Sequence, residues 1–287
     1  LFRKPQTPKG PFSYNIEEVS FKNKKEKITL AGTLTTPKNK SDFPIVVMAS
    51  GTGPQNRNGD MAGHSFFWVI ADYLTKNGIG VLRYDDRGVG KSEGKQTGAD
   101  IKDFANDLTA AVKFLKKQKR FKNNLVGVIG HSEGGTHSMI AQNKCLNIDF
   151  SIFMASIGTT GKEVYIEQHR AILKANESSA DQIASQAKFI KSLIEVSAKK
   201  DNEVVIKQVL KKRYKELAEQ QPNIKITEFQ FIAYFLNFAN NDWFRTLMAF
   251  DASKYLKKVK KPFFAMHGNR DVQVDPNSNF LAFQKAR

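Results

Sequence analysis

The chain has 287 residues, of which 40% are apolar, and its formal net charge at pH 7 is +17. This length suits one α/β domain with an insertion. No apolar run approaches the roughly 20 residues of a membrane span. The single cysteine, Cys145, excludes an intrachain disulfide framework and a cysteine-based metal site. We expect a soluble protein without metal or cofactor. Its compartment stays open, because the chain begins at Leu1 without a methionine or an apolar signal segment.

The positive charge is spread over many short clusters of lysine and arginine on predicted helix faces. The clusters lie at residues 116–117, 119–120, 199–200, 211–213, 257–258 and 260–261. No stretch combines basic residues with the aromatic spacing of a nucleic-acid module. We therefore expect a solvated basic surface and no nucleic-acid partner.

Apolar patterning predicts alternating strands and helices over the first half of the chain. The predicted strands are 17–21, 28–34, 43–50, 79–84, 125–129 and 150–154, and the predicted helices between them are 66–76 and 99–117. Most of these strands are continuous apolar runs, as in strands buried on both faces. The order predicts an α/β fold with a mostly parallel, doubly wound sheet and helices on both faces.

The alternation stops between about residues 158 and 250, where no good strand candidate occurs. Helical segments are predicted at 163–175, 180–198, 203–219 and 226–238, and a strand at 262–267 then resumes the sheet. A helical insertion between two strands favours a lid over the carboxyl ends of the strands, where open α/β sheets bind ligands. A second helical domain with its own task is the alternative. The predicted organisation is a core at 1–157, a lid at 158–250 and the rest of the core at 251–287.

A glycine-rich turn, Gly130-His131-Ser132-Glu133-Gly134, links the predicted strand 125–129 to a helix. A G-x-S-x-G sequence between a strand and a helix is typical of the nucleophile elbow, in which the serine has a strained backbone. Glycine on either side removes side chains that would collide with neighbouring elements. We predict that Ser132 is a catalytic nucleophile. The alternative is a serine that only caps the helix.

A serine nucleophile needs a base that accepts its proton and an acid that orients the base. In α/β folds that carry a nucleophile elbow, the acid follows the serine along the chain, and the histidine comes last. Asp271, in the loop after strand 262–267, is the predicted acid. Asp275 is the alternative, although the proline after it is more typical of a helix start.

The base is missing from this order, because none of the five histidines follows Asp271. The side chain of His131 is expected to point away from the neighbouring serine hydroxyl. His64 lies in the loop after the third strand, within reach of the pocket, but would break the chain order. We therefore expect a truncated chain, inactive alone, whose edge strand, histidine loop and last helix lie beyond Arg287.

Several linked motifs resemble the esterases of the serine aminopeptidase-like group of α/β hydrolases. They lie at residues 50–57 (SGTGPQNR), 82–92 (LRYDDRGVGKS), 130–135 (GHSEGG), 242–245 (DWFR) and 268–271 (GNRD). The similarity runs from about residue 5 to 283. It implies an α/β-hydrolase fold with a lid, and a serine hydrolase that forms an acyl-enzyme on Ser132. It also implies a histidine loop shortly beyond the end of this chain.

The resemblance assigns further roles. It implies an oxyanion hole made by the backbone N–H groups of Thr52 and Glu133, where donors stabilise the tetrahedral intermediate. Arg87 is expected to brace the top of the sheet rather than bind substrate. The expected partner is a small carboxylic ester, which His64, Trp243 and Phe244 would contact, although aromatic lid residues are more often core. A serine peptidase and a non-catalytic binding protein remain the alternatives, and the oligomeric state stays open.

Overall fold

The computed structural model describes residues 6–220 and 224–286. The strands are β1 (Tyr14–Asn23), β2 (Ile28–Pro37), β3 (Ile45–Ala49), β4 (Asp60–Met61), β5 (His64–Ser65), β6 (Gly80–Tyr84), β7 (Val126–His131), β8 (Phe150–Met154) and β9 (Phe263–Met266). The helices are α1 (Phe66–Lys76), α2 (Ile101–Lys117), α3 (Glu133–Lys144), α4 (Gly161–Ala175), α5 (Ala180–Ser197), α6 (Glu203–Gln220), α7 (Glu228–Ala239), α8 (Asp242–Met248), α9 (Ala252–Leu256) and α10 (Pro276–Lys285). A short 3₁₀ turn covers Lys119–Phe121.

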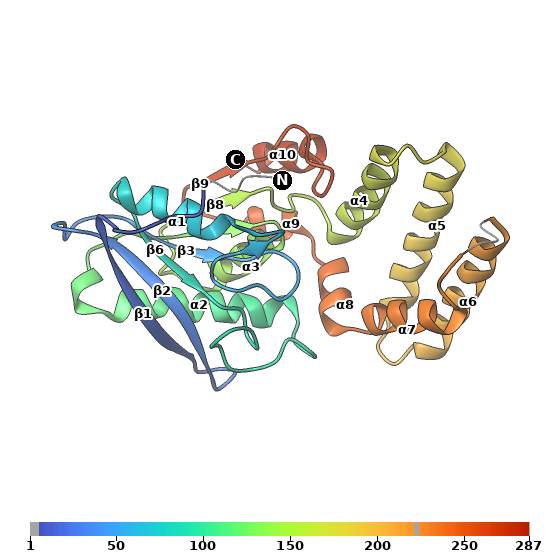
Figure 1. The fold of residues 1–287 in the computed structure, drawn as a ribbon, viewed down its shortest axis with the longest axis horizontal. Helices are drawn as coiled ribbons and strands as arrows, with labels where there is room; N and C mark the ends of the chain where they lie inside the picture. The colour runs from blue at the N-terminus through green and yellow to red at the C-terminus, as the bar shows by residue number, and fades with distance from the viewer. Residues whose placement is uncertain (1–5, 221–223, 287) are drawn as a thin grey trace.

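One seven-stranded sheet organises the molecule, in the order β1-β2-β6-β3-β7-β8-β9 (Figure 1). The β1–β2 and β2–β6 pairs are antiparallel, whereas every pair from β6 to β9 is parallel. The predicted mostly parallel α/β sheet is therefore confirmed. Because parallel strands end at the same edge, the loops after β3, β6, β7, β8 and β9 all meet there.

The central strands are buried on both faces, as their continuous apolar runs predict. In β3, Ile45 and Val47 pack against the cluster that includes α2, whereas Val46 and Met48 pack against the cluster that includes α1. This follows from the two-residue period of a strand, which sends successive side chains to opposite faces. Helices thus pack on both faces of the sheet, and this packing supports the edge at which the loops meet.

Helices α4 to α8 lie between β8 and β9 in sequence and are gathered to one side of the sheet (Figure 1). A single apolar cluster joins them to the core: Phe244 and Leu247 of α8 pack in the same cluster as Met139 of α3 and Phe153 of β8. The helical insertion is therefore anchored to the sheet through α8. No described helix is both long and apolar enough to cross a membrane.

Three local features differ from the sequence-based expectation. Strands β1 and β2 are longer than predicted, because their ten-residue ladder extends to Tyr14 and Pro37. A small hairpin, β4–β5, forms in the loop after β3, and strands of two residues carry no periodic signal. The segment after α7 forms two further short helices, α8 and α9, each begun by a side-chain cap, from Asn241 and Asp251 respectively.

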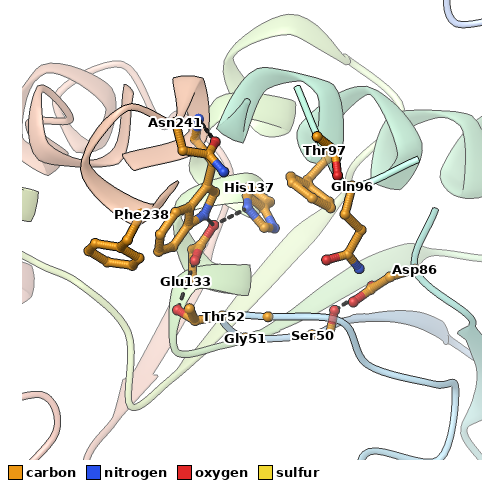
Figure 2. Close-up of a pocket in the computed structure, with 13 residues that line it drawn as sticks. Ser50, Gly51, Thr52, Asp86, Gln96, Thr97, Glu133, His137, Phe238 and Asn241 are labelled. Carbon is orange, nitrogen blue, oxygen red and sulfur yellow. Dashed lines mark hydrogen bonds and ion pairs between the residues drawn. The ribbon is translucent and has the colours of Figure 1, made fainter. Parts of the chain in front are cut away.

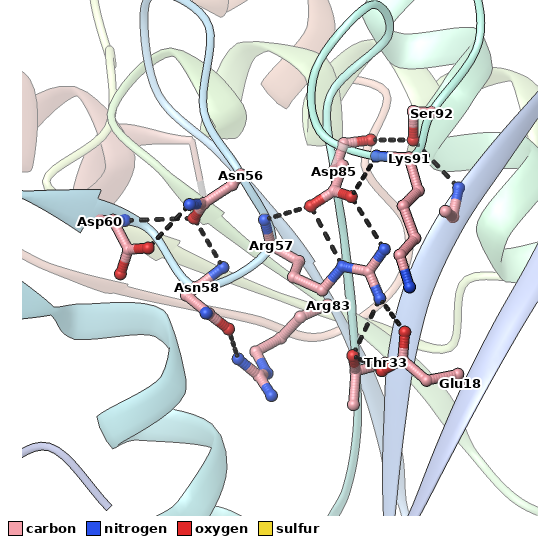
Figure 3. Close-up of polar contacts among 11 residues, drawn as sticks. Glu18, Thr33, Asn56, Arg57, Asn58, Asp60, Arg83, Asp85, Lys91 and Ser92 are labelled. Atoms are coloured by element: carbon pink, nitrogen blue, oxygen red, sulfur yellow. Dashed lines mark hydrogen bonds and ion pairs between the residues drawn. The ribbon is translucent and has the colours of Figure 1, made fainter.

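A buried ion pair fastens the loop after β3 to the loop after β6. Asp85 accepts hydrogen bonds from Arg57 Nη2 at 2.8 Å, Arg57 Nε at 3.1 Å and the backbone N–H of Lys91 at 3.1 Å (Figure 3). Burial opposes ionisation of Asp85, but these hydrogen bonds hold the pKa of the carboxyl below its ordinary value. One carboxylate, whose oxygens both accept hydrogen bonds, thus holds the two loops together.

Arg87 braces the same region, as predicted. Its Nε donates to Asp107 of α2 at 2.7 Å, its Nη2 donates to the Asp103 carbonyl at 2.8 Å, and its guanidinium lies over the Phe104 ring. Both partners of the Arg87–Asp107 pair are buried. These contacts tie the loop after β6 to α2.

Replacement of Asp85 by asparagine should destabilise the fold, because it leaves the buried Arg57 guanidinium without its main counter-charge. We expect D85N to lower the free energy of unfolding by about 3 kcal/mol, measured by urea denaturation. The matched control is E17Q, which removes the exposed Glu17–Arg120 pair and should cost about 0.5 kcal/mol or less. Equal effects of the two variants would contradict this account.

Candidate active site

Ser132 occupies a strained turn between β7 and α3. Its φ is 54° and its ψ is −121°, and it is one of the few non-glycine residues with a positive φ. The Ser132 N–H donates to the Met154 carbonyl at 2.9 Å, and the Ser132 carbonyl accepts from the Gly135 N–H at 3.0 Å. Positive φ is costly for a residue with a Cβ and persists only where the surroundings enforce it. The turn therefore has the backbone strain that the sequence motif requires.

The neighbouring glycines permit this turn because α3 approaches the sheet too closely for side chains. A Cβ on Gly130 would lie 2.5 Å from the Gly134 carbonyl oxygen, and a Cβ on Gly134 would overlap the carbonyl of Ala49 in β3. The absence of side chains lets the first turn of α3 lie directly on β3 and β7. This close approach places Ser132 at the sheet edge.

A cavity of about 320 Å³ opens beside this turn. It is lined by the loop after β3 (Ser50, Gly51, Thr52, Gly53), by Asp86, Gln96, Thr97 and Phe104, by Glu133 and His137 of α3, and by Phe238, Asn241 and Trp243 of the helical insertion (Figure 2). Gly51 connects the cavity to the serine, because a Cβ at Gly51 would lie 3.2 Å from Ser132 Cβ. The site is thus built from the sheet edge and the insertion together.

Two backbone donors close to Ser132 in the chain or in the neighbouring loop have no hydrogen-bond partner among the described residues. Among the described residues, neither the Thr52 N–H nor the Glu133 N–H donates a hydrogen bond to another group. The Glu133 N–H also belongs to the first turn of α3, where backbone N–H groups carry partial positive charge. Two unpaired donors, one on the residue after Ser132 and one in the loop that approaches it at Gly51, suit the binding of a negatively charged oxygen.

The Glu133 side chain is buried and holds three side chains from different segments (Figure 2). Its Oε2 accepts from Thr52 Oγ1 at 2.8 Å, and its Oε1 accepts from Trp243 Nε1 at 2.7 Å and lies 3.1 Å from His137 Nε2. Burial would raise the pKa of this carboxyl, but His137, Trp243 and Thr52 together hold the pKa below its ordinary value. The carboxylate is therefore the ionised form.

Asp86 holds the same loop from the opposite end of the cavity (Figure 2). Its Oδ1 accepts from Ser50 Oγ at 2.6 Å, and its Oδ2 accepts from the Gln55 N–H at 2.9 Å. Thr52 lies between these two contacts in the chain. Burial raises the pKa of Asp86 to about 7, although both hydrogen bonds oppose the rise.

Asp271 lies in the loop after β9, as predicted. Its Oδ1 accepts from the backbone N–H groups of Gln273 at 2.8 Å and Val274 at 3.0 Å. Within the described residues its Oδ2 makes no hydrogen bond. The alternative acid, Asp275, caps α10 through the Ser278 N–H at 2.8 Å, so the expectation of a helix start there is confirmed.

No histidine side chain in the described part of the chain is hydrogen-bonded to Ser132. His131 packs edge to face against the rings of Phe66 and Phe67, and burial lowers its pKa although the charge of Asp271 opposes the shift. His267 Nε2 lies 2.9 Å from the Ser156 carbonyl. His137 pairs with Glu133, and His169 contacts the Tyr165 carbonyl within α4.

The predicted substrate contacts divide into two groups. Trp243 lines the cavity, together with Thr52 and Glu133. Phe244 is fully buried in the apolar cluster and lines no part of this cavity, because the adjacent Trp243 takes the outward position on α8. His64 is exposed in the β4–β5 hairpin and is also absent from the lining. Ser132 and Asp271 are absent from this lining as well, so the contacts of Phe244 and His64 with substrate stay predictions.

Sequence reasoning missed the side-chain roles of Glu133, His137 and Asp86. Glu133 and His137 are four residues apart on α3, a spacing that would have marked a shared helix face. Asp86 was part of a recognised motif, but its two hydrogen bonds to the loop after β3 carry no sequence signal. The described residues contain no group of three or more His, Cys, Asp or Glu side chains arranged to hold a metal.

The raised pKa of Asp86 makes a pH-dependent contribution to stability. Between the ordinary value of 3.8 and about 7, the folded protein binds a proton at Asp86 that the unfolded chain does not. This contribution favours folding at low pH and is lost as the pH rises through 7.

We therefore expect the unfolding free energy of the parent protein to fall, relative to that of D86N, between pH 5 and pH 8. Urea denaturation at both pH values measures this difference. D42N is the matched control, because Asp42 is exposed, and it should show no such change. A constant difference between the parent protein and D86N at both pH values would contradict the assignment.

Comparison with known proteins places the chain in a family. The model of the serine aminopeptidase S33 family matches residues 61–287. Esterase EstD of Thermotoga maritima is 34% identical over 120 residues, which are 42% of this chain and 29% of that protein. The match thus spans less than a third of that relative.

Solved structures agree in fold. An esterase of Pyrococcus furiosus, Pf2001, superposes with a TM-score of 0.59 at 18% identity, covering 96% of this chain and 77% of that one. An esterase of Exiguobacterium antarcticum gives a TM-score of 0.52 at 18% identity, covering 94% and 87%. With a family model that spans most of its residues and this shared fold, the chain belongs to the serine aminopeptidase S33 family of α/β hydrolases.

Proposed function

We propose that this protein is a serine hydrolase that cleaves small carboxylic esters through an acyl-enzyme on Ser132. The observation that carries the proposal is the strained Ser132 turn, with the unpaired N–H groups of Thr52 and Glu133 beside it. This pairing of a strained serine with free donors is the arrangement that acyl transfer requires. A serine that only capped α3 would use its side chain on the helix N–H groups, and Ser132 makes no such hydrogen bond.

The proposed reaction follows from this geometry. Ser132 Oγ attacks the ester carbonyl while a base removes its proton, and the carbonyl oxygen becomes an oxyanion held by the Thr52 and Glu133 N–H groups. Collapse of this intermediate expels the alcohol, which takes the proton from the base. Water then attacks the acyl-enzyme by the same route and releases the carboxylic acid and free Ser132.

We propose that the base is a histidine from outside these 287 residues, oriented by Asp271. The free Oδ2 of Asp271 supports this, because it can accept the N–H of an imidazole. The exposed alternate residues of β9, Phe264 at 58% and Met266 at 45%, also support a further element packed there. Under this proposal the 287 residues alone would hydrolyse esters poorly.

The helical insertion (residues 158–250) would act as a lid, between core segments at residues 1–157 and 251–287. Its Phe238 and Trp243 supply an apolar wall, and their rings meet edge to face at 5.5 Å. A cavity of this size with an apolar wall suits a short acyl or alcohol group. Phe231 and Phe244, in contrast, are buried in the apolar cluster that joins the insertion to the sheet.

Peptide hydrolysis is the second candidate, favoured by the name of the matched family. The carboxylates of Asp86 and Glu133 line the cavity, but both are occupied by hydrogen bonds within the protein. Neither is therefore free to bind the amino terminus of a peptide. The esterase relative favours ester substrates.

A fluorophosphonate probe tests the proposal directly, because it reacts only with an activated serine. In the full-length protein we expect stoichiometric labelling of Ser132, located by peptide mass spectrometry, and no labelling of S132A. S138A is the matched control, since Ser138 is buried on the same helix, and should label normally. An unlabelled parent protein would exclude the serine-hydrolase proposal.

The rates on two kinds of substrate separate the two candidates. Faster release of p-nitroaniline from aminoacyl anilides than of p-nitrophenol from short esters would favour the peptidase.

A further inference from the structure

The Glu133 side chain joins three segments that are distant in the sequence. Thr52 lies in the loop after β3, His137 lies one turn along α3, and Trp243 lies on α8 of the helical insertion. The hydrogen bonds to Thr52 and Trp243 span 81 and 110 residues. One carboxylate therefore connects the sheet edge, the turn at Ser132 and the insertion.

These contacts depend on one another. Glu133 is 2% exposed, so its carboxylate depends mainly on donors from the protein itself. A buried carboxylate is tolerated only when its oxygens are satisfied by donors. Movement of α8 that withdrew the Trp243 N–H would leave Oε1 underpaired, and rotation of Glu133 to follow it would release Thr52. The position of α8 is in this way linked to that of the loop after β3.

The same two residues provide the unpaired backbone donors beside Ser132. Thr52 is held through its hydroxyl, and its own N–H has no hydrogen-bond partner among the described residues; Glu133 carries the other N–H. The side-chain bond between Thr52 and Glu133 therefore links the two residues that carry these donors. Asp86 secures the same loop at Ser50 and Gln55, and among the described residues its side chain has no hydrogen bond to either donor residue.

The third partner faces the cavity. Trp243 lines it together with Phe238, so a molecule bound there touches the ring whose N–H is bonded to Glu133. Displacement of the indole by a bound molecule would distort its hydrogen bond to the Glu133 carboxylate. Trp243 in the cavity lining and the two residues that carry the backbone donors, Thr52 and Glu133, are thus joined by hydrogen bonds.

We propose that the Glu133 side chain is a positioning residue that couples the seating of α8 at the cavity to the placement of the Thr52 and Glu133 N–H donors. This inference rests on the proposed function, in which those donors bind the oxyanion. The side chain does not react with substrate. It holds the two N–H donors in position relative to Ser132 while Trp243 of α8 is hydrogen-bonded to it.

Steady-state kinetics with p-nitrophenyl esters, on the full-length protein, form the first test. E133Q and T52V should lower kcat about 10- to 100-fold with a change in KM of less than about threefold, because donors placed for the transition state act mainly on kcat. T52S keeps the hydroxyl and should stay within about threefold of the parent protein. The control E195Q, on α5 and remote from the cavity, should be unchanged.

The double variant E133Q/T52V tests the coupling itself. If one hydrogen bond carries both effects, the double variant should lose about as much kcat as either single variant. Losses that multiply would show independent roles and overturn the proposal. So would kcat values for E133Q and T52V equal to that of E195Q, or losses confined to KM.

Fluorescence gives a second test that needs no catalysis. These 287 residues contain two tryptophans, so W68F, with phenylalanine at any tryptophan outside them, leaves Trp243 as the sole emitter. In that background, E133Q and T52V should both shift the Trp243 emission and raise its quenching by acrylamide, whereas T52S and E195Q should not. An unchanged T52V spectrum would overturn the link between Thr52 and α8. If Ser132 fails to label, the proposed function fails, and these spectra alone decide whether the coupling exists.

Discussion

The close contact between α3 and the central strands is the constraint on which the rest of the site depends. Gly130 and Gly134 carry no side chains, so the first turn of α3 lies directly on β3 and β7. That contact forces the backbone of Ser132 to a positive φ. A larger residue at either glycine would separate the helix from the sheet and move the serine away from both donors.

Two buried carboxylates then fix the loop after β3 against this turn. Asp86 binds it at Ser50 and Gln55, and Glu133 binds it at Thr52. They do so in different electrostatic states, because burial raises the pKa of Asp86 to about 7 while three donors keep that of Glu133 low. The loop therefore combines a contact that responds to pH with one that stays charged. Preorganised donors of this kind need little rearrangement during a reaction.

The sequence predicted the elements with strong periodicity and the motifs read along one stretch of chain. The parallel strands, the turn at Ser132 and the loop of Asp271 all fall in these classes, because continuous apolar runs and short motifs are local signals. Side-chain partners that are distant in the sequence leave no such signal, and Glu133 with Trp243 is the clearest case. The aromatic residues of the insertion are a second case. Their periodicity does not predict that Trp243 lines the cavity while Phe244 is buried in the core.

The central claim is that Ser132 and the N–H groups of Thr52 and Glu133 form one acyl-transfer site. A crystal structure of the full-length protein after reaction with a fluorophosphonate tests it most directly. The account predicts a covalent bond from Ser132 Oγ to phosphorus, with the phosphoryl oxygen about 3 Å from both backbone nitrogens. An adduct on another residue, or a phosphoryl oxygen turned away from Thr52 and Glu133, would contradict it.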